Sequence, residues 1–432
     1  MRAASESTAL GARAPAQSNP LLHDSILSIA AAATDAGGAF VVNLLIGRLL
    51  GERPTGEYGY AQTLASTLLA LFGVGLPSYL VQEMAARRGR AAEWRQHAAT
   101  IIRAYALISL PLALASFLAL NAALRGRMGA YGTVAPAMVG VFAALLSGMF
   151  IGCFQGLGDF RPGFVATVLT RLGSSLAVVA VYLAGRGIGA YLSAAALVQV
   201  AVAGAMGWVL SRRISARPLP GRATLDHLRA SLPFGIIVLL EITYFRADTL
   251  LVEWLVGGSA TGWYVAAYAF YMVPLVLTWA AASAFYPWVA ERTARGASQE
   301  RERFRMTLAL LAGGICAAVG LRIAGPPALL ALYGAHFAPS GPILSTLALA
   351  VPLVALNRLC VVNLKGTGRV RSAAISSAAA AVVAVLANLV CLPRFGVLAA
   401  AWVTVATEGV LLLGVSVAGG WRGPAPSVER PA

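Results

Sequence analysis

Eight charged residues interrupt long apolar runs of the sequence. They are the acids Asp35, Glu241, Asp248 and Glu408 and the arginines Arg103, Arg171, Arg246 and Arg358. A carboxyl group in apolar surroundings is pushed toward its neutral form, so it can exchange a proton near physiological pH or hold Na⁺ when ionised. A guanidinium group offers paired donors to a phosphate. The residues therefore predict two chemistries, cation exchange at the acids and anion binding at the arginines.

The composition shows what kind of element must carry these charges. The 432 residues are 59% hydrophobic and 12% charged, with a mean hydropathy of +0.75, whereas soluble domains carry about 25% charge. A membrane-spanning helix needs roughly 20 apolar residues, and twelve windows satisfy that length. They cover residues 25–50, 58–82, 99–123, 134–156, 163–185, 188–210, 231–256, 263–288, 305–325, 341–364, 372–392 and 396–419. The chain is thus predicted to be an all-α integral membrane protein with twelve transmembrane helices.

The net charge of +16 comes from basic residues in the loops between apolar runs. In a soluble protein such a charge would suggest nucleic acid, but here most of it falls on alternate loops, which is the positive-inside pattern of membrane proteins. The pattern predicts that both termini are cytoplasmic, and nucleic acid is excluded as a partner.

An internal repeat divides the predicted helices into two halves. Thr55-Gly56 precedes the second span, and Thr261-Gly262 stands 206 residues later before the eighth. Six helices per repeat make the halves parallel, and such duplications are typical of transporters, with the substrate path in a central cleft between the halves. The predicted boundaries are a disordered cytoplasmic tail (1–24), an N-terminal half (25–211), a cytoplasmic connector (212–229), a C-terminal half (230–419) and a cytoplasmic tail (420–432).

The same step of 206 residues relates Asp35 to Glu241, so an acid near the middle of the first helix recurs in the seventh. This recurrence favours an ion-coupling role for both. The competing interpretation is that the buried charges are ion pairs between helices. That interpretation suits Arg246 and Asp248 better than Asp35, whose own helix carries no basic residue at that depth.

Motifs of enzymes are missing from the sequence. Lys365 is the single lysine and follows Leu364, so a Walker A motif is impossible. The four histidines, His23, His97, His227 and His336, are scattered at the edges of spans without an HExxH pattern, so structural or solvated roles are expected. We therefore predict no catalytic residues, no metal site and no cofactor beyond H⁺ or Na⁺ coupling.

Three stretches carry a resemblance to a known family. Leu49-Leu50-Gly51 runs into Gly56-Glu57-Tyr58-Gly59-Tyr60, Leu232-Pro233-Phe234-Gly235 is followed by Tyr244-Phe245-Arg246-Ala247-Asp248, and Gly262-Trp263-Tyr264 opens the eighth span. They resemble the polysaccharide-transport branch, the O-antigen flippases, of the multidrug/oligosaccharidyl-lipid/polysaccharide (MOP) flippase superfamily. The lipid II flippases of that superfamily generally have fourteen helices, which fits twelve spans less well.

The resemblance implies that the chain moves polyprenyl-pyrophosphate-linked oligosaccharide across the bacterial inner membrane by alternating access, beside membrane lipids and the polysaccharide polymerase machinery. Arg171 and Arg246 are then the central candidates for binding phosphate, and Arg103 and Arg358 are candidates at the cytoplasmic mouth. Two alternatives stay open. One is a cation-coupled multidrug exporter of the same superfamily, in which Asp35 would supply the acid of the first helix. The other is a structural or scaffold membrane protein, which unpaired charge within the spans disfavours.

Overall fold

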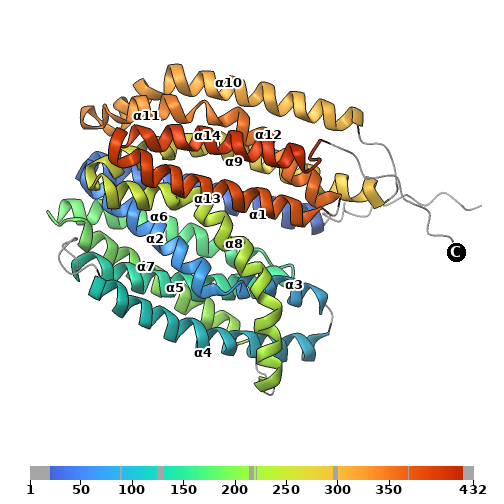
Figure 1. Ribbon diagram of the computed structural model, residues 1–432. Helices are drawn as coiled ribbons and strands as arrows, with labels where there is room; N and C mark the ends of the chain where they lie inside the picture. The colour runs from blue at the N-terminus through green and yellow to red at the C-terminus, as the bar shows by residue number, and fades with distance from the viewer. Residues whose placement is uncertain are drawn as a thin grey trace, which may run out of the picture.

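The computed structural model describes residues 20–87, 90–123, 131–213, 218–219, 221–294, 300–367 and 369–421. These residues form fourteen α-helices and one 3₁₀ turn (Figure 1). The helices are α1 (Pro20–Leu50), α2 (Glu52–Gly73), α3 (Leu76–Ala86), α4 (Ala91–Ala123), α5 (Tyr131–Gly156), α6 (Arg161–Leu183), α7 (Ile188–Ser211), α8 (Gly221–Leu255), α9 (Gly258–Ala294), α10 (Glu300–Tyr333), η1 (Ala335–Phe337), α11 (Ser340–Leu347), α12 (Ala350–Gly366), α13 (Val370–Phe395) and α14 (Leu398–Val417).

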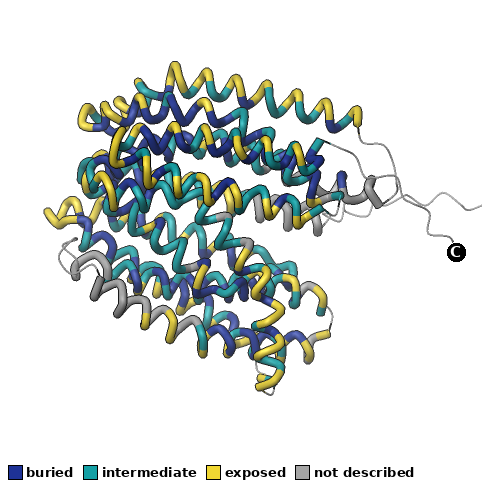
Figure 2. The backbone as a smooth tube through the Cα atoms, in the orientation of Figure 1, coloured by how far each residue is buried: buried dark blue, intermediate teal, exposed yellow. Residues whose placement is uncertain are grey.

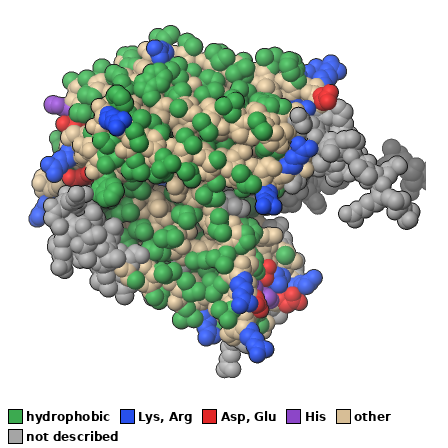
Figure 3. Space-filling view, in the orientation of Figure 1, with side chains coloured by type: hydrophobic (Ala, Val, Ile, Leu, Met, Phe, Trp, Pro, Cys, Tyr) green, Lys and Arg blue, Asp and Glu red, His purple; other side chains and the backbone are tan. Residues whose placement is uncertain are grey.

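The helices and the surface both fit a bilayer. Within the described residues, ten helices are long and apolar enough to cross a membrane, or up to eleven if the bent pair α2–α3 counts as one. Large apolar side chains face outward, for example Leu183 at 77% and Ile323 at 72% exposure, which water would disfavour. Hydrophobic side chains cover the visible face and most charged ones lie toward its ends (Figure 3). The multi-pass prediction is confirmed, whereas the count of twelve stays a prediction, because many side chains of α4, the helix over span 99–123, lie outside the described residues.

Two predicted spans are each divided into two helices. Span 58–82 breaks between α2 and α3, which meet at a bend of 56°, and span 341–364 breaks between α11 and α12. Pro77 and Pro352 lie in the first turns of the helices that follow the breaks, where proline is tolerated because backbone N–H groups at a helix start have no partner within the helix. At the first break Gly75 has a φ of 71°. A Cβ at Gly75 would overlap the backbone of Ser231 and Gly235, so the break lets α8 pass close by.

The helices pack as two groups, visible one above the other in Figure 1. One apolar cluster joins buried residues of α8 to α14, among them Tyr264 and Leu344, and another joins α2 to α7, among them Phe72 and Leu145. Buried residues lie between the helices and exposed ones on their outer faces (Figure 2). Helix α8 runs from one group to the other and packs against α2 and α3 as well as α13. The predicted boundaries at residues 211 and 230 stay a prediction.

Backbone contacts join the two groups at the end predicted to be external. The starts of α2 and α9 meet so closely that a Cβ at Gly56 would overlap the carbonyl oxygen of Gly258, and one at Gly262 would overlap that of Glu52. Nearby, the Tyr333 hydroxyl donates to Asn43 Oδ1 at 2.6 Å. The two copies of the repeat motif are therefore the residues that hold this end together. Elsewhere, the surface is hollowed between the two groups (Figure 3).

This close contact makes a stability prediction. We expect Gly262→Ala to lower the thermal unfolding temperature of the purified protein in detergent, because the added Cβ forces the helix starts apart at a cost of about 1–3 kcal/mol. The matched control is Gly320→Ala in α10, where a Cβ would meet nothing within 4 Å. Equal unfolding temperatures for the two variants would show that the helix starts yield freely.

Candidate functional site

An ion pair joins α1 to α6 near the middle of both helices. Arg171 donates from Nε and Nη2 to Asp35 Oδ1 at 2.9 and 2.7 Å. The arginine side chain is 19% exposed and the aspartate 58%. Gly38 lies against the aliphatic part of Arg171, where a Cβ would leave too little room. The sequence favoured pairing least at Asp35, and this preference is wrong because the partner comes from a helix 136 residues away.

The ion pair lines a cavity of about 580 Å³ between α1 and the group of α2 to α7. Its walls come from α1, α2, α5, α6 and α7, with one residue from α8. The polar residues that line it are Asp35, Tyr58, Gln62, Ser66, Ser147, Thr167, Thr170, Arg171, Ser174, Tyr191 and Gln199. Ligand pockets in proteins are of roughly 300–1,000 Å³. The cavity can therefore hold a polar molecule and offers it hydroxyl, amide and guanidinium groups together.

Sequence reasoning from charges alone missed these neutral polar residues. Thr167, Thr170, Arg171 and Ser174 recur on α6 at steps of three and four residues, which places them on one face of a helix. Such a polar stripe inside an apolar span is the signal that predicts a cavity-lining face. Three small residues of α5 at steps of four, Gly140, Ala144 and Gly148, line the same cavity.

A second polar region lies among α8, α9, α13 and α14. Asp248 accepts hydrogen bonds from the Tyr264 hydroxyl and from the Thr249 backbone, the latter at 2.7 Å. Glu408 is 4% exposed and its Oε2 accepts from Asn357 Nδ2 at 2.7 Å. Both acids line a cavity of about 20 Å³ together with Asn388.

The oxygens around that small cavity are not all satisfied. Asn388 Oδ1 and Thr407 Oγ1 are buried and have no hydrogen-bond partner among the described residues. A cavity of about 10–15 Å³ or more holds one water. The region therefore has room for one small occupant between oxygen ligands.

The remaining arginines lie in different places. Arg246 stacks over the Tyr268 ring at 5.3 Å, and among the described residues no ion pair joins it to Asp248. Arg358 lies over the Trp279 ring at 4.6 Å and lines a largely apolar cavity of about 130 Å³ with Asn357, Lys365 and Glu408.

Two further predicted residues add nothing to these cavities. Arg103 is exposed on α4 and lines none of the three cavities found among the described residues. Glu241 belongs to α8, but its side chain lies outside the described ones. Its relation to Asp35 therefore stays a prediction.

Fold and cavities together define a multi-pass membrane protein with polar sites inside its helical groups. Residues 21–292 match the family described as polysaccharide biosynthesis protein. The match covers more than half of the chain, and the chain belongs to this family. No curated protein sequence matches the chain.

Solved structures of MOP superfamily transporters share the fold. The lipid II flippase MurJ in an inward closed conformation aligns with a TM-score of 0.75 at 15% identity, over 91% of this chain and 87% of MurJ. An inward-facing multidrug resistance MATE family transporter aligns with a TM-score of 0.72 at 14% identity, over 91% and 97%. A MOP superfamily transporter from Pyrococcus furiosus Vc1 aligns with a TM-score of 0.66 at 16% identity, over 93% and 94%. The predicted all-α MOP fold is confirmed.

The Asp35–Arg171 pair predicts energetic coupling between α1 and α6. In a double-mutant cycle of Asp35→Ala and Arg171→Ala, we expect a coupling of about 1 kcal/mol in unfolding free energy, because the two hydrogen bonds are lost only once in the double variant. The measurement is unfolding of the purified variants in detergent. Strictly additive effects would mean that the pair contributes nothing to holding the helices together.

Proposed function

We propose that the chain flips a polyprenyl-pyrophosphate-linked oligosaccharide from the cytoplasmic to the outer leaflet of the bacterial inner membrane. The observation that carries the proposal is the cavity of about 580 Å³ in which Arg171 lies among neutral hydroxyl and amide groups. Membership of the polysaccharide biosynthesis family supports it, as does the fold shared with the lipid II flippase MurJ. Both termini are then cytoplasmic, and the product is passed to polymerase machinery on the outer side.

The lining of the cavity suits the two parts of such a headgroup. Arg171 already holds one carboxylate oxygen of Asp35 with two donors, and a phosphate oxygen accepts the same pair of donors. Because Asp35 stays in the cavity when a phosphate oxygen takes its place at Arg171, the charge balance is kept only when Asp35 binds a proton or a cation. The hydroxyl groups of Tyr58 and Tyr191 and the amides of Gln62 and Gln199 match sugar hydroxyls, which need partners when they leave water.

The physical task is to lower the barrier of crossing an apolar layer. Each polar group costs several kcal/mol in an apolar medium without a partner, and an ion costs far more. A polar cavity replaces the hydration of the headgroup while the lipid tail stays in the bilayer. Because the end with Gly56 and Gly262 is held closed by backbone contacts, the headgroup enters from the opposite, cytoplasmic end and leaves after the groups of helices rock.

Coupling to an ion is assigned to the small cavity at Asp248 and Glu408. Carboxylate and amide oxygens are suitable ligands for a hard cation, and Asn388 Oδ1 has a free acceptor position among the described residues. A proton on one acid or one Na⁺ between them cancels one of their two negative charges. Three further arginines are proposed to guide the charged headgroup. Arg246 lies on α8, and Arg358 and Arg103 lie toward the cytoplasmic mouth.

A multidrug exporter is the second candidate, because a MATE family transporter shares the fold over 97% of its own length. Its substrates would be cationic drugs. The positive charge of Arg171 repels a cation, so such a drug would bind only where Asp35 leaves Arg171 and attracts the drug instead. The two candidates differ in what accumulates when the protein is missing.

Deletion of the gene tests the substrate class. We expect lipid-linked oligosaccharide to accumulate with its headgroup in the cytoplasmic leaflet, measured by accessibility to an impermeant glycan-modifying enzyme. Complementation with Arg171→Gln should lower the flipping rate about 10- to 100-fold, because charge-assisted hydrogen bonds of about 1.5–3 kcal/mol are lost.

The matched control is Arg305→Gln on α10, an exposed arginine outside the cavities, which should complement fully. Normal oligosaccharide distribution in the deletion strain, with raised sensitivity to cationic drugs, would instead establish the exporter.

A separate prediction concerns coupling. Glu408→Gln keeps the size of the side chain and removes its titration, so transport by reconstituted protein should lose its dependence on pH or Na⁺. Asp159→Asn removes an acid that pairs with Arg213 at 3.0 Å near the helix ends and should leave this dependence intact. Unchanged ion dependence in Glu408→Gln would remove the acid from the coupling mechanism.

A further inference from the structure

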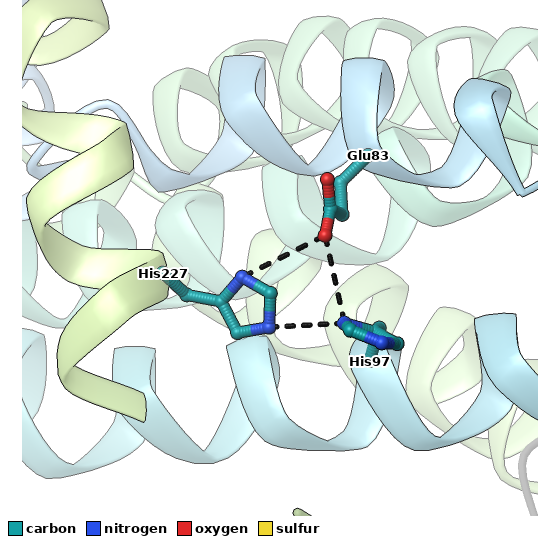
Figure 4. Close-up of side chains that lie close together, drawn as sticks. All are labelled: Glu83, His97 and His227. Atoms are coloured by element: carbon teal, nitrogen blue, oxygen red, sulfur yellow. Dashed lines mark hydrogen bonds and ion pairs between the residues drawn. The ribbon is translucent and has the colours of Figure 1, made fainter. Parts of the chain in front are cut away.

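Three side chains from three helices converge away from the transport cavities. Glu83 comes from α3, His97 from α4 and His227 from α8 (Figure 4). His97 Nδ1 lies 3.1 Å from His227 Nε2 and 3.5 Å from Glu83 Oε1. One ligand atom from each residue lies within 4.8 Å of the others. Side-chain exposure is 22% for His97, 15% for Glu83 and 6% for His227.

The spacing of these atoms is that of metal ligands. Zn²⁺ bonds of about 2.0–2.1 Å at tetrahedral angles place two ligand atoms about 3.3 Å apart. The two distances from His97 Nδ1 fall on either side of that value. Two imidazoles and one carboxylate are also a common protein ligand set for Zn²⁺, with the fourth position left to water.

A neighbouring hydroxyl group orients one of the imidazoles. The Tyr79 hydroxyl lies 2.9 Å from His227 Nδ1. When Nδ1–H donates to Tyr79, the lone pair of Nε2 points toward His97. Metal-binding histidines almost always have such a partner on their other nitrogen, which fixes the tautomer. Burial lowers the pKa of His97, so its ring is neutral and can act as a ligand at neutral pH.

Charges around the cluster bear on its affinity. Arg87 Nη1 lies 2.8 Å from Glu83 Oε1, and its positive charge opposes a cation. The same Oε1 lies 3.5 Å from His97 Nδ1, and a carboxylate oxygen has two lone pairs, so it can accept from Arg87 and bind a metal at the same time. Two further acids, Glu93 near His97 and Asp226 near His227, contribute negative charge. Because the positive charge of Arg87 offsets part of this negative charge, we expect the metal to bind reversibly and not as a permanent structural ion.

We propose that Glu83, His97 and His227 bind a divalent transition-metal ion of the Zn²⁺ class, which ties the start of α8 to α3 and α4. The ion binds only the arrangement in which α8 lies against both helices, so it stabilises that arrangement. Because α8 contacts both groups of helices, the bound ion restrains their relative movement. The site is independent of the transported substrate.

Zinc binding by the full chain tests the proposal. The protein is purified in detergent with a tag free of histidine, treated with a chelator, and titrated with ZnCl₂ against a chromogenic zinc indicator. We expect one tightly bound Zn²⁺ per chain, a higher unfolding temperature with Zn²⁺, and no effect of Mg²⁺, which prefers oxygen ligands. Co²⁺ in the same site should give the visible absorption of a tetrahedral complex.

Variants separate metal binding from folding. His227→Gln and Glu83→Gln should weaken Zn²⁺ binding at least 10-fold and abolish the thermal shift, whereas His336→Ala should match the unsubstituted protein. His336 is exposed and offers its backbone carbonyl to Trp263. Because Glu83→Gln keeps its size, it serves if His227→Gln does not fold. Equal Zn²⁺ binding in His336→Ala and Glu83→Gln, or no binding by the unsubstituted protein, would overturn the proposal and leave a hydrogen-bonded cluster.

Discussion

The backbone contact between the starts of α2 and α9 determines how the rest of the molecule is arranged. Gly56 and Gly262 let two helix ends approach to a distance that any side chain would prevent. The two groups of helices are therefore joined at one end, with the buried hydrogen bond from Tyr333 to Asn43 beside the contact. Any movement that opens this end must first separate the glycine contact, while the opposite end stays accessible without breaking it.

The charges inside the helices are divided according to what balances them. Arg171 and Asp35 balance each other and face the larger cavity, so an anion bound at Arg171 would leave the charge of Asp35 to be balanced by a proton or a cation. Asp248 and Glu408 receive hydrogen bonds from neutral groups, Tyr264 and Asn357. Neutral donors stabilise a carboxylate but do not cancel its charge, so these acids depend on a proton, a cation or a nearby arginine. The proposed anion binding and the proposed cation exchange thus fall in different parts of the molecule.

The sequence predicts features that depend on neighbouring residues, such as the positions of the helices, but not the contacts between distant helices. Apolar runs long enough to span a bilayer locate the helices, but the breaks at 74–75 and 348–349 fall inside the predicted spans 58–82 and 341–364. The Gly56 and Gly262 repeat is visible by eye, yet only the structure shows that its two copies contact each other. The pairing of Asp35 with Arg171 depends on how α1 packs against α6, which no spacing along the chain encodes.

The histidine cluster illustrates the same limit. His97 and His227 are 130 residues apart, and each alone is an ordinary polar residue near a helix end. They meet because α3 and α4 are consecutive helices and the start of α8 turns back onto both of them. Nothing in the spacing of four scattered histidines distinguishes this pair from His23 or His336.

Helix α8 connects these observations. According to the sequence repeat, α8 is the first helix of the C-terminal half. Its first residues nevertheless pack against α3 and α4, where His227 is buried. Pro233 lies inside the helix. Two residues later, Gly235 lies against the backbone of Val74 and Gly75, just before the start of α3. A proline inside a helix removes one backbone hydrogen bond and weakens the helix locally. If the start of α8 is held against α3 and α4, and the starts of α2 and α9 are held by their glycines, relative movement of the two groups must be absorbed at this proline. The sequence Leu232-Pro233-Phe234-Gly235 is therefore the part of α8 that would have to bend if the two groups rock as proposed.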